Sequence, residues 1–510
     1  MTSATQHVTR PANGADGVAR ALKSAGVDRV FALCGDHVNT LFHAVHRAGI
    51  EIVGARHESA AVQMADGSAR ATGKPGVAIV TGGPGHTNSV TGAAVAQGAQ
   101  SPVVIISGQA PKARRERGGN QSLHQADIMR PVTKWAIEAE SSASLGELTL
   151  RALLAASSGT PGAVSLSIPV DVADAAIDET LPRRAGLVGE PAIVASTDTV
   201  AQAAELLRSA RQPVLVLGGP ARQHAPYAAL ALAVQALGIP VFTNGHARGV
   251  VADDGDLCFG HASPLFNAMF RSASEADLWL VAGTAVDYNI ANVVAPQARV
   301  IQIHGDPRQA GVGCVPDIAL TGQPAATLAA LAKALGRRPA SWNAWRAAMQ
   351  SRYREQREYW ARTGDAPSKD ERGVHPAALC SALKRYHTPD TTLVVDVGDF
   401  VNWPKACFPV LRPARYMDGG ALGNLGGALP IAIGAAIARP EHPVWAFSGD
   451  GGFGFHSWEL SLAAERRLPL TIVVGNDRAW GTEKRLQLKS CGSDLACDLP
   501  DIRYDAYASL

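Results

Sequence analysis

Short apolar runs alternate with longer alanine-rich stretches along most of the chain. In the first third, runs rich in Val, Ile, Leu and Ala occupy residues 28–35, 51–58, 76–83, 102–109 and 163–169. Runs of this length, bounded by Gly or Pro, are typical of buried strands, and most of the stretches between them are compatible with helices. Strands that alternate with helices indicate a parallel sheet that is covered on both faces.

The same alternation occurs twice more. Further strand-like runs lie at residues 212–219, 239–245, 276–283, 298–306, 391–399, 443–450 and 469–477. We therefore predict an α/β chain of three doubly wound parallel-sheet domains, over residues 8–175, 193–336 and 374–510. Three units of similar size indicate a duplicated architecture.

Two segments separate these units, and the third unit looks short. Residues 170–192 are charged and contain Pro, which predicts a linker, and residues 337–373 are rich in Arg, Trp and Glu, which predicts a helical connector. Residues 502–508 resemble the start of a helix, so we expect the third domain to lack a closing helix and strand.

Composition excludes several classes of protein. The 510 residues contain 47 Lys and Arg against 45 Asp and Glu, so no charge excess favours nucleic acid or a membrane as a partner. The seven cysteines form no C-x-x-C pair, which argues against a zinc site or a disulfide framework. The polar N-terminus lacks the apolar core of a signal peptide, and no apolar run spans a membrane. We expect a cytoplasmic protein.

The stretch "SGDGGFG" at residues 448–454 places one carboxylate, Asp450, among four glycines directly after an apolar run. A helix of about four turns is expected to follow, up to Arg466 or Arg467, and the next strand ends at Asn476. A β-α-β crossover makes the two strands parallel, so Asp450 and Asn476 meet at the carboxyl edge, where α/β sheets bind ligands. An empty strand–turn–helix junction is the alternative.

This pattern suits a magnesium diphosphate. Mg²⁺ prefers oxygen ligands, which Asp450 and Asn476 supply, together with phosphate oxygens and water. Gly451 and Gly452 allow backbone N–H groups to approach a phosphate at a helix N-terminus, whose dipole favours anions.

The G-D-G sequence, with an Asn 26 residues after the Asp, resembles the thiamine diphosphate motif of the superfamily that includes acetolactate synthase, pyruvate oxidase and benzaldehyde lyase. The resemblance implies that Asp450 and Asn476 bind Mg²⁺ and that the carbonyl of Arg478 is a third ligand. The family often has Asn-Asn where this chain has Gly475-Asn476.

Residues 55–89 resemble the family segment that contains a catalytic glutamate at a strand end. The resemblance implies that Glu58 hydrogen-bonds the aminopyrimidine ring of a partner subunit's cofactor and takes part in the proton relay that activates it. Active sites at the interface of a homodimer or homotetramer follow from that arrangement. A strand-end Glu can also be a helix cap or a surface charge.

Three further segments extend the resemblance. Residues 419–436 resemble the segment that holds the cofactor bent, with the Gly423 carbonyl on its amino group and Leu425 beneath the bend. Residues 117–135 resemble a loop whose active-site glutamine aligns with Gln121. Residues 34–42 place His37 where some carboligases and lyases have a catalytic histidine. The alternatives are an ordinary core residue for Leu425 and a solvated loop residue for His37.

The reaction depends on the side chains that line the pocket, which the resemblance implies are His37, Gln121, Trp480 and Glu483. Trp480 walls the acceptor pocket or simply packs beside the cofactor. We expect a carboligase or decarboxylase, acetolactate synthase-like, that acts on small 2-oxo acids or aldehydes. A 2-hydroxyacyl-CoA or hydroxyketone lyase and a non-catalytic cofactor-binding protein are the alternatives. Some relatives bind FAD or ADP in the central domain, but residues 217–222 and 281–289 are too generic to predict FAD here.

Overall fold

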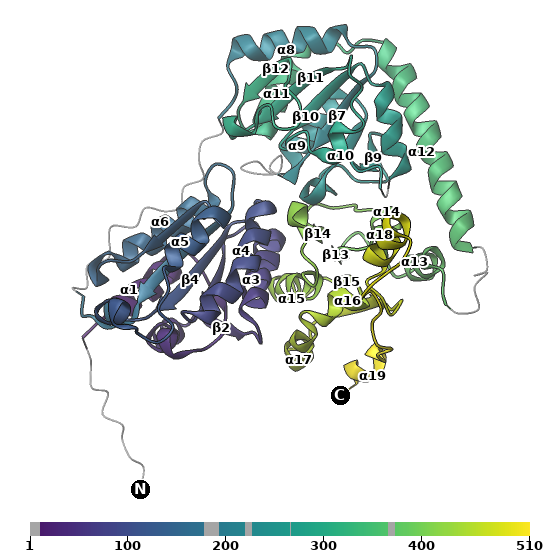
Figure 1. The fold of residues 1–510 in the computed structure, drawn as a ribbon. Helices are drawn as coiled ribbons and strands as arrows, with labels where there is room; N and C mark the ends of the chain where they lie inside the picture. Colours follow the sequence, from purple (N-terminus) through teal and green to yellow (C-terminus); the bar gives the residue numbers. More distant parts are fainter. Residues whose placement is uncertain (1–10, 178–192, 220–226, 266, 366–372, 510) are drawn as a thin grey trace. The chain divides into compact units, whose positions relative to one another are not determined.

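The computed structural model describes residues 11–177, 193–219, 227–265, 267–365 and 373–509 (Figure 1). The chain divides into two compact units, one built from residues up to 188 apart from 70–72, and one from the remainder. Parts of the expected linker (178–192) and of the generic Gly-rich segment (220–222) lie outside the described residues, as do residues 1–10. Within the described ranges, no helix is long and apolar enough to cross a membrane.

The first unit contains a parallel sheet of six strands in the order β2-β1-β3-β4-β6-β5. The strands are β1 (Arg29–Ala32), β2 (Glu51–Gly54), β3 (Gly76–Val80), β4 (Val103–Gln109), β5 (Trp135–Glu138) and β6 (Ala163–Pro169). The helices are α1 (Gly14–Ser24), α2 (Asn39–Arg47), α3 (Glu58–Thr72), α4 (Pro84–Gly98), α5 (Gln125–Met129), α6 (Leu145–Ser157) and α7 (Val170–Asp174). Every residue of β3 and β4 is buried, as expected for central strands with both faces covered.

The second unit contains two parallel sheets. The central one has the order β12-β11-β10-β7-β8-β9. Its strands are β7 (Pro213–Leu217), β8 (Val241–Thr243), β9 (Cys258–His261), β10 (Leu278–Ala282), β11 (Arg299–His304) and β12 (Ile318–Thr321). Its helices are α8 (Thr197–Ser209), α9 (Tyr227–Leu237), α10 (Tyr288–Ala291) and α11 (Pro324–Leu335), and the long helix α12 (Ser341–Asp365) follows.

The C-terminal sheet has the order β14-β13-β15-β16. Its strands are β13 (Thr392–Val395), β14 (Tyr416–Asp418), β15 (Val444–Gly449) and β16 (Leu470–Gly475). Its helices are α13 (Pro376–Lys384), α14 (Asn402–Cys407), α15 (Ala428–Ala438), α16 (Asp450–Gly454), α17 (Leu460–Glu465), α18 (Gly481–Cys491) and α19 (Tyr504–Ala508). Helix α15 is buried on nearly every side, which explains why its sequence is apolar all round.

The predicted fold class is confirmed, since all three sheets are parallel and carry helices. Four short strands were not predicted: β5, β9, β12 and β14. The prediction of one continuous helix after Asp450 was wrong. Helix α16 ends at Gly454, and a short 3₁₀ turn (Ser457–Glu459) precedes α17. The glycines of this segment favour helix poorly, which explains the interruption.

Candidate functional site

The first group of candidate residues lies at the carboxyl edge of the N-terminal sheet. Glu58 is the first residue of α3 and is 6% exposed. The side chain of His57 caps this helix, since its ring nitrogen accepts from Ser59 N at 3.1 Å. The carboxylate of Glu58 instead accepts from Asn88 Nδ2 at 3.0 Å. Glu58 is therefore neither the helix cap nor a surface charge.

The turn formed by Gly82, Gly83, Pro84 and Gly85, which leads from β3 into α4, lies against all three predicted catalytic residues. A Cβ atom at Gly82 would lie 2.7 Å from His37 Nδ1, and one at Gly85 would lie 3.0 Å from Glu58 Oε1. A Cβ atom at Gly83 would lie 2.5 Å from Gln121 Cβ. The glycines thus allow His37, Glu58 and Gln121 to approach one short backbone segment.

His37 is buried and not a solvated loop residue. It lies in a 3₁₀ turn (Asp36–Val38) and is 8% exposed. Its Nδ1 has no hydrogen-bond partner among the described residues, and burial lowers its pKa. A neutral imidazole with a free nitrogen can accept or donate a proton.

Gln121 has a backbone conformation that few residues adopt. Its φ is 58°, in the left-handed region, where residues other than glycine carry a conformational cost. The same holds for Arg478, whose φ is 56°. Among the described residues, six other than glycine have a positive φ, and two of these six, Gln121 and Arg478, are candidate site residues.

The second group lies at the carboxyl edge of the C-terminal sheet. Asp450 follows β15 directly and is 2% exposed. Its Oδ2 has no hydrogen-bond partner among the described residues. Burial, together with the charge of Asp477, raises the pKa of Asp450 to about 6. A desolvated carboxylate with a free oxygen and a second carboxylate nearby fits a divalent cation.

Asn476 stands beside Asp450 because β15 and β16 pair in parallel, with Gly449 opposite Gly475. The Asn476 amide accepts from Arg478 N at 3.3 Å and donates to Ile502 O at 3.2 Å. Over the described part of the chain, no cluster of three or more His, Cys, Asp or Glu residues forms a metal site. The predicted ligand set is of another kind, since it consists of one carboxylate, one amide and one backbone carbonyl.

The glycines next to Asp450 are closely packed. A Cβ atom at Gly451 would lie 2.4 Å from the Trp480 ring, and one at Gly452 would lie 2.9 Å from Asp396 Oδ2. Trp480 therefore packs on the Gly-rich turn. This contact agrees with the interpretation of Trp480 as a packing residue. That Trp480 also forms a wall of the acceptor pocket stays a prediction.

The remaining predicted residues are more open. Gly423 is exposed and has a φ of 65°, and Leu425 is only partly buried, which makes it unlike an ordinary core leucine. Glu483 is exposed in the first turn of α18.

Sequence reasoning missed Asp396, which organises the C-terminal group. Asp396 follows β13 and is 2% exposed. Its carboxylate accepts from Ser448 Oγ at 2.6 Å and from Gly426 N at 3.0 Å. It thereby joins the Gly-rich segment around Gly423 to the strand that precedes Asp450. An Asp at the end of an apolar run, in "VVDVGD", was the available signal.

Three family models match the chain in order. They describe the N-terminal TPP binding domain (residues 12–128), the central domain (200–331) and the C-terminal TPP binding domain (396–509) of thiamine pyrophosphate enzymes. This chain belongs to the thiamine pyrophosphate enzyme family. His37, Glu58 and Gln121 fall in the first matched range, and Asp450 and Asn476 fall in the last.

Curated relatives align with nearly the whole of this thiamine pyrophosphate enzyme. The 2-hydroxyacyl-CoA lyase 2 of Danio rerio is 31% identical over 98% of this chain and 85% of its own length. The human protein of that name is 31% identical over 96% of this chain and 82% of its own length. A probable acetolactate synthase of Mycobacterium bovis is 32% identical over 96% of this chain and 88% of its own length. The family prediction is confirmed, and two activities remain candidates.

Proposed function

We propose that this thiamine pyrophosphate enzyme, with Mg²⁺, forms or breaks a carbon–carbon bond next to a carbonyl. The observation that carries the proposal is the convergence of Glu58, His37 and Gln121 on one glycine turn. When bound, thiamine diphosphate supplies a nucleophilic carbon and accepts the electron pair of the cleaved bond. Asp450, Asn476 and the Arg478 carbonyl would hold the cation, and Gly451 and Gly452 would face the diphosphate.

The side chains of the N-terminal group divide the work of proton transfer and orientation. Glu58, held by Asn88, would exchange a proton with the ring nitrogen of the bound cofactor. The neutral imidazole of His37 gives or takes a proton at the substrate oxygen. Gln121 donates an amide N–H to the substrate and so orients it.

The substrate we propose is a small 2-oxo acid, or the aldehyde that combines with it, as for acetolactate synthase. The probable acetolactate synthase of M. bovis supports this substrate class. The second candidate is cleavage of a 2-hydroxyacyl-CoA, supported by the equally similar lyases of D. rerio and human. The same residues would serve both reactions: the first breaks the bond to carbon dioxide and then forms a new carbon–carbon bond, and the second only breaks one.

We also propose that two chains share each site. Glu58 of one subunit would serve the cofactor that Asp450 of its partner anchors, so at least a homodimer is needed for turnover. Sedimentation of the active species tests this proposal, and an active monomer would contradict it.

The experiment supplies purified protein with thiamine diphosphate, Mg²⁺ and either a panel of 2-oxo acids and aldehydes or 2-hydroxyacyl-CoA thioesters. Carbon dioxide and a new hydroxyketone support the first candidate, and an aldehyde released from the thioester supports the second. Glu58→Gln should retain cofactor binding and lose at least about 100-fold in turnover. Full activity of Glu58→Gln would contradict its role, and cofactor binding without any reaction would favour a non-catalytic protein.

A further inference from the structure

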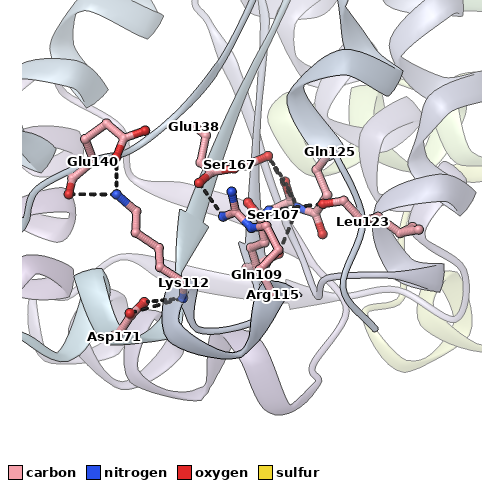
Figure 2. Close-up of polar contacts among 11 residues, drawn as sticks. Ser107, Gln109, Lys112, Arg115, Leu123, Gln125, Glu138, Glu140, Ser167 and Asp171 are labelled. Atoms are coloured by element: carbon pink, nitrogen blue, oxygen red, sulfur yellow. Dashed lines mark hydrogen bonds and ion pairs between the residues drawn. The ribbon is translucent and has the colours of Figure 1, made fainter. Parts of the chain in front are cut away.

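One buried side chain, Gln125, holds the glycine turn against which the three candidate residues lie. Gln125 begins α5 and is 0% exposed. Its Oε1 accepts from Gly83 N at 3.1 Å. Its Nε2 donates to Gly108 O at 3.0 Å and lies 3.3 Å from the hydroxyls of Ser107 and Ser167 (Figure 2).

The surrounding hydrogen bonds fix the orientation of this amide. His86 Nε2 lies 2.9 Å from Gln125 O, and because a carbonyl only accepts, Nε2 carries the proton. Nδ1 of the neutral ring then accepts from Ser107 Oγ at 3.0 Å. Burial lowers the pKa of His86 to about 4, which keeps the ring neutral. Because Ser107 donates to His86, its oxygen is left to accept from Gln125 Nε2 or Ser167.

Both ends of the Gln125 amide reach glycines that contact candidate residues. Oε1 binds Gly83, on which Gln121 packs, and a Cβ atom at Gly82 would lie 3.1 Å from Oε1 and 2.7 Å from His37 Nδ1. Nε2 binds the carbonyl of Gly108, where a Cβ atom would lie 2.3 Å from His37 O. Gln125 thus sets the backbone on which His37 and Gln121 rest.

A second amide supports the loop that contains Gln121. Gln109, at the end of β4, is 0% exposed and donates from Nε2 to Leu123 O at 3.1 Å (Figure 2). Two buried amides therefore hold the short segment from Gln121 to Gln125. Glu58 has a further support that does not involve the Gln125 side chain directly, the hydrogen bond from Asn88 on α4.

We propose that Gln125 is a positioning residue that sets the places of His37 and Gln121 for the substrate, while leaving the contact between Glu58 and the cofactor intact. The proposal rests on the proposed function of this site. The proposal assigns two tasks to different residues. Glu58 activates the cofactor, and His37 and Gln121 act on the substrate.

The test compares Gln125→Met with a matched control. Met keeps the length and removes every polar atom of the side chain. Gln97→Met on α4 is the control, because Gln97 Oε1 also accepts from a backbone N–H, that of Ala163 at 3.1 Å, away from the site. Turnover is measured together with deuterium exchange at C2, the nucleophilic carbon of the bound cofactor. This exchange depends on the Glu58 step alone.

We expect Gln125→Met to lose about 10- to 100-fold in kcat, with C2 exchange and cofactor affinity within about twofold of wild type. Gln97→Met should match wild type in all three. Equal losses of C2 exchange and turnover would show general damage around Glu58, His37 and Gln121, and would overturn the proposal. Unchanged turnover would overturn it as well.

A second measurement uses the cofactor-free protein and no substrate. Amide hydrogen exchange of the peptide that covers residues 119–124 should rise about tenfold in Gln125→Met, whereas the peptide that covers residues 57–64 stays unchanged. A wild-type protein without activity would contradict the proposed function. The exchange pattern would still show whether Gln125 positions the loop. Unchanged exchange at residues 119–124 would overturn the positioning role.

Discussion

At the scale of single residues, folding leaves two polar atoms unsatisfied at the candidate site. Asp450 Oδ2 and His37 Nδ1 are both buried without a partner among the described residues. Each such atom costs about 1–3 kcal/mol while it stays unpaired, and a ligand that paired with it would remove that cost. The two atoms lie at the carboxyl edges of different sheets, where a metal ion and a substrate oxygen are expected.

Asp450→Asn should abolish the rise in melting temperature that Mg²⁺ and thiamine diphosphate produce together. Without ligand, the variant should be more stable than wild type by about 1 kcal/mol at pH 7.5, since the wild-type carboxylate ionises against a pKa raised to about 6. Melting curves with and without ligand measure both effects. A Mg²⁺-dependent shift that persists in Asp450→Asn would contradict the metal site.

His86 predicts a pH dependence of stability. Its pKa is lowered to about 4 in the folded protein, so its contribution is complete above the unfolded value of about 6.5 and is lost as pH falls toward 4. Because of His86, the free energy of local unfolding of β4 should be about 2 kcal/mol lower at pH 5 than at pH 7. Hydrogen exchange of β4 peptides in wild type and His86→Asn measures the difference. An equal loss in both would contradict it.

At the scale of elements, the junctions between strand and helix position the site. Gly83 caps α4 at φ 60° and ψ −118°, a conformation that residues with a Cβ rarely adopt. Asp450 occupies the corresponding junction between β15 and α16. Strand ends and helix starts, and not helix interiors, therefore determine where the chemistry lies.

Gly83→Ala should lower turnover at least about tenfold and destabilise the N-terminal unit by about 2–4 kcal/mol, because the new methyl group meets Gln121 and the backbone is strained. Gly73→Ala is the matched control. Its φ is 74°, but a Cβ atom there has no neighbour within 4 Å, so a cost of about 1 kcal/mol is expected. Activity and urea unfolding compare the two. Equal effects would remove the steric argument.

The strands that sequence patterns missed share one place in the fold. β5, β9, β12 and β14 each lie at the edge of a sheet, and each is three or four residues long. An edge strand has one neighbour, and β5 and β12 are only partly buried, so their apolar patterns are weak. Central strands such as β3 and β4 were predicted because both faces are covered.

The site residues show the same limit. The candidates Asp450 and Asn476 could be proposed because each stands at the end of an apolar run, whereas Glu58 was proposed from the family resemblance of residues 55–89. Gln125 and Asp396 act through hydrogen bonds to residues as far as 42 and 52 positions away, Ser167 and Ser448, and no local pattern reports such contacts.

At the scale of the whole molecule, a buried arginine links the central and C-terminal domains of the second unit. Arg248 is 3% exposed and donates to Asp253 at 2.7 Å. It also donates to the carbonyls of Lys405 and Phe408, at 3.2 Å each. One central-domain side chain therefore binds backbone of the C-terminal domain, in and just after α14.

Arg248→Met should destabilise the second unit by about 3–5 kcal/mol, because Asp253 would remain buried without its cation. Adding Asp253→Asn to the same chain should restore part of the loss. Arg352→Met, which removes an exposed pair with Glu275, is the control and should cost less than about 1 kcal/mol. Urea unfolding measures all three. No recovery in the double variant would contradict the buried-charge argument.

The sheet orders described above have an evolutionary consequence. The strands at one side of the N-terminal sheet follow the order β2-β1-β3-β4, and the C-terminal sheet repeats it as β14-β13-β15-β16. The glycine turn that follows β3 and Asp450 that follows β15 stand at equivalent positions. Duplication of one ancestral gene would produce such a match. Under the proposed function, the neighbours of one turn would transfer protons, and the equivalent turn would hold a charged anchor.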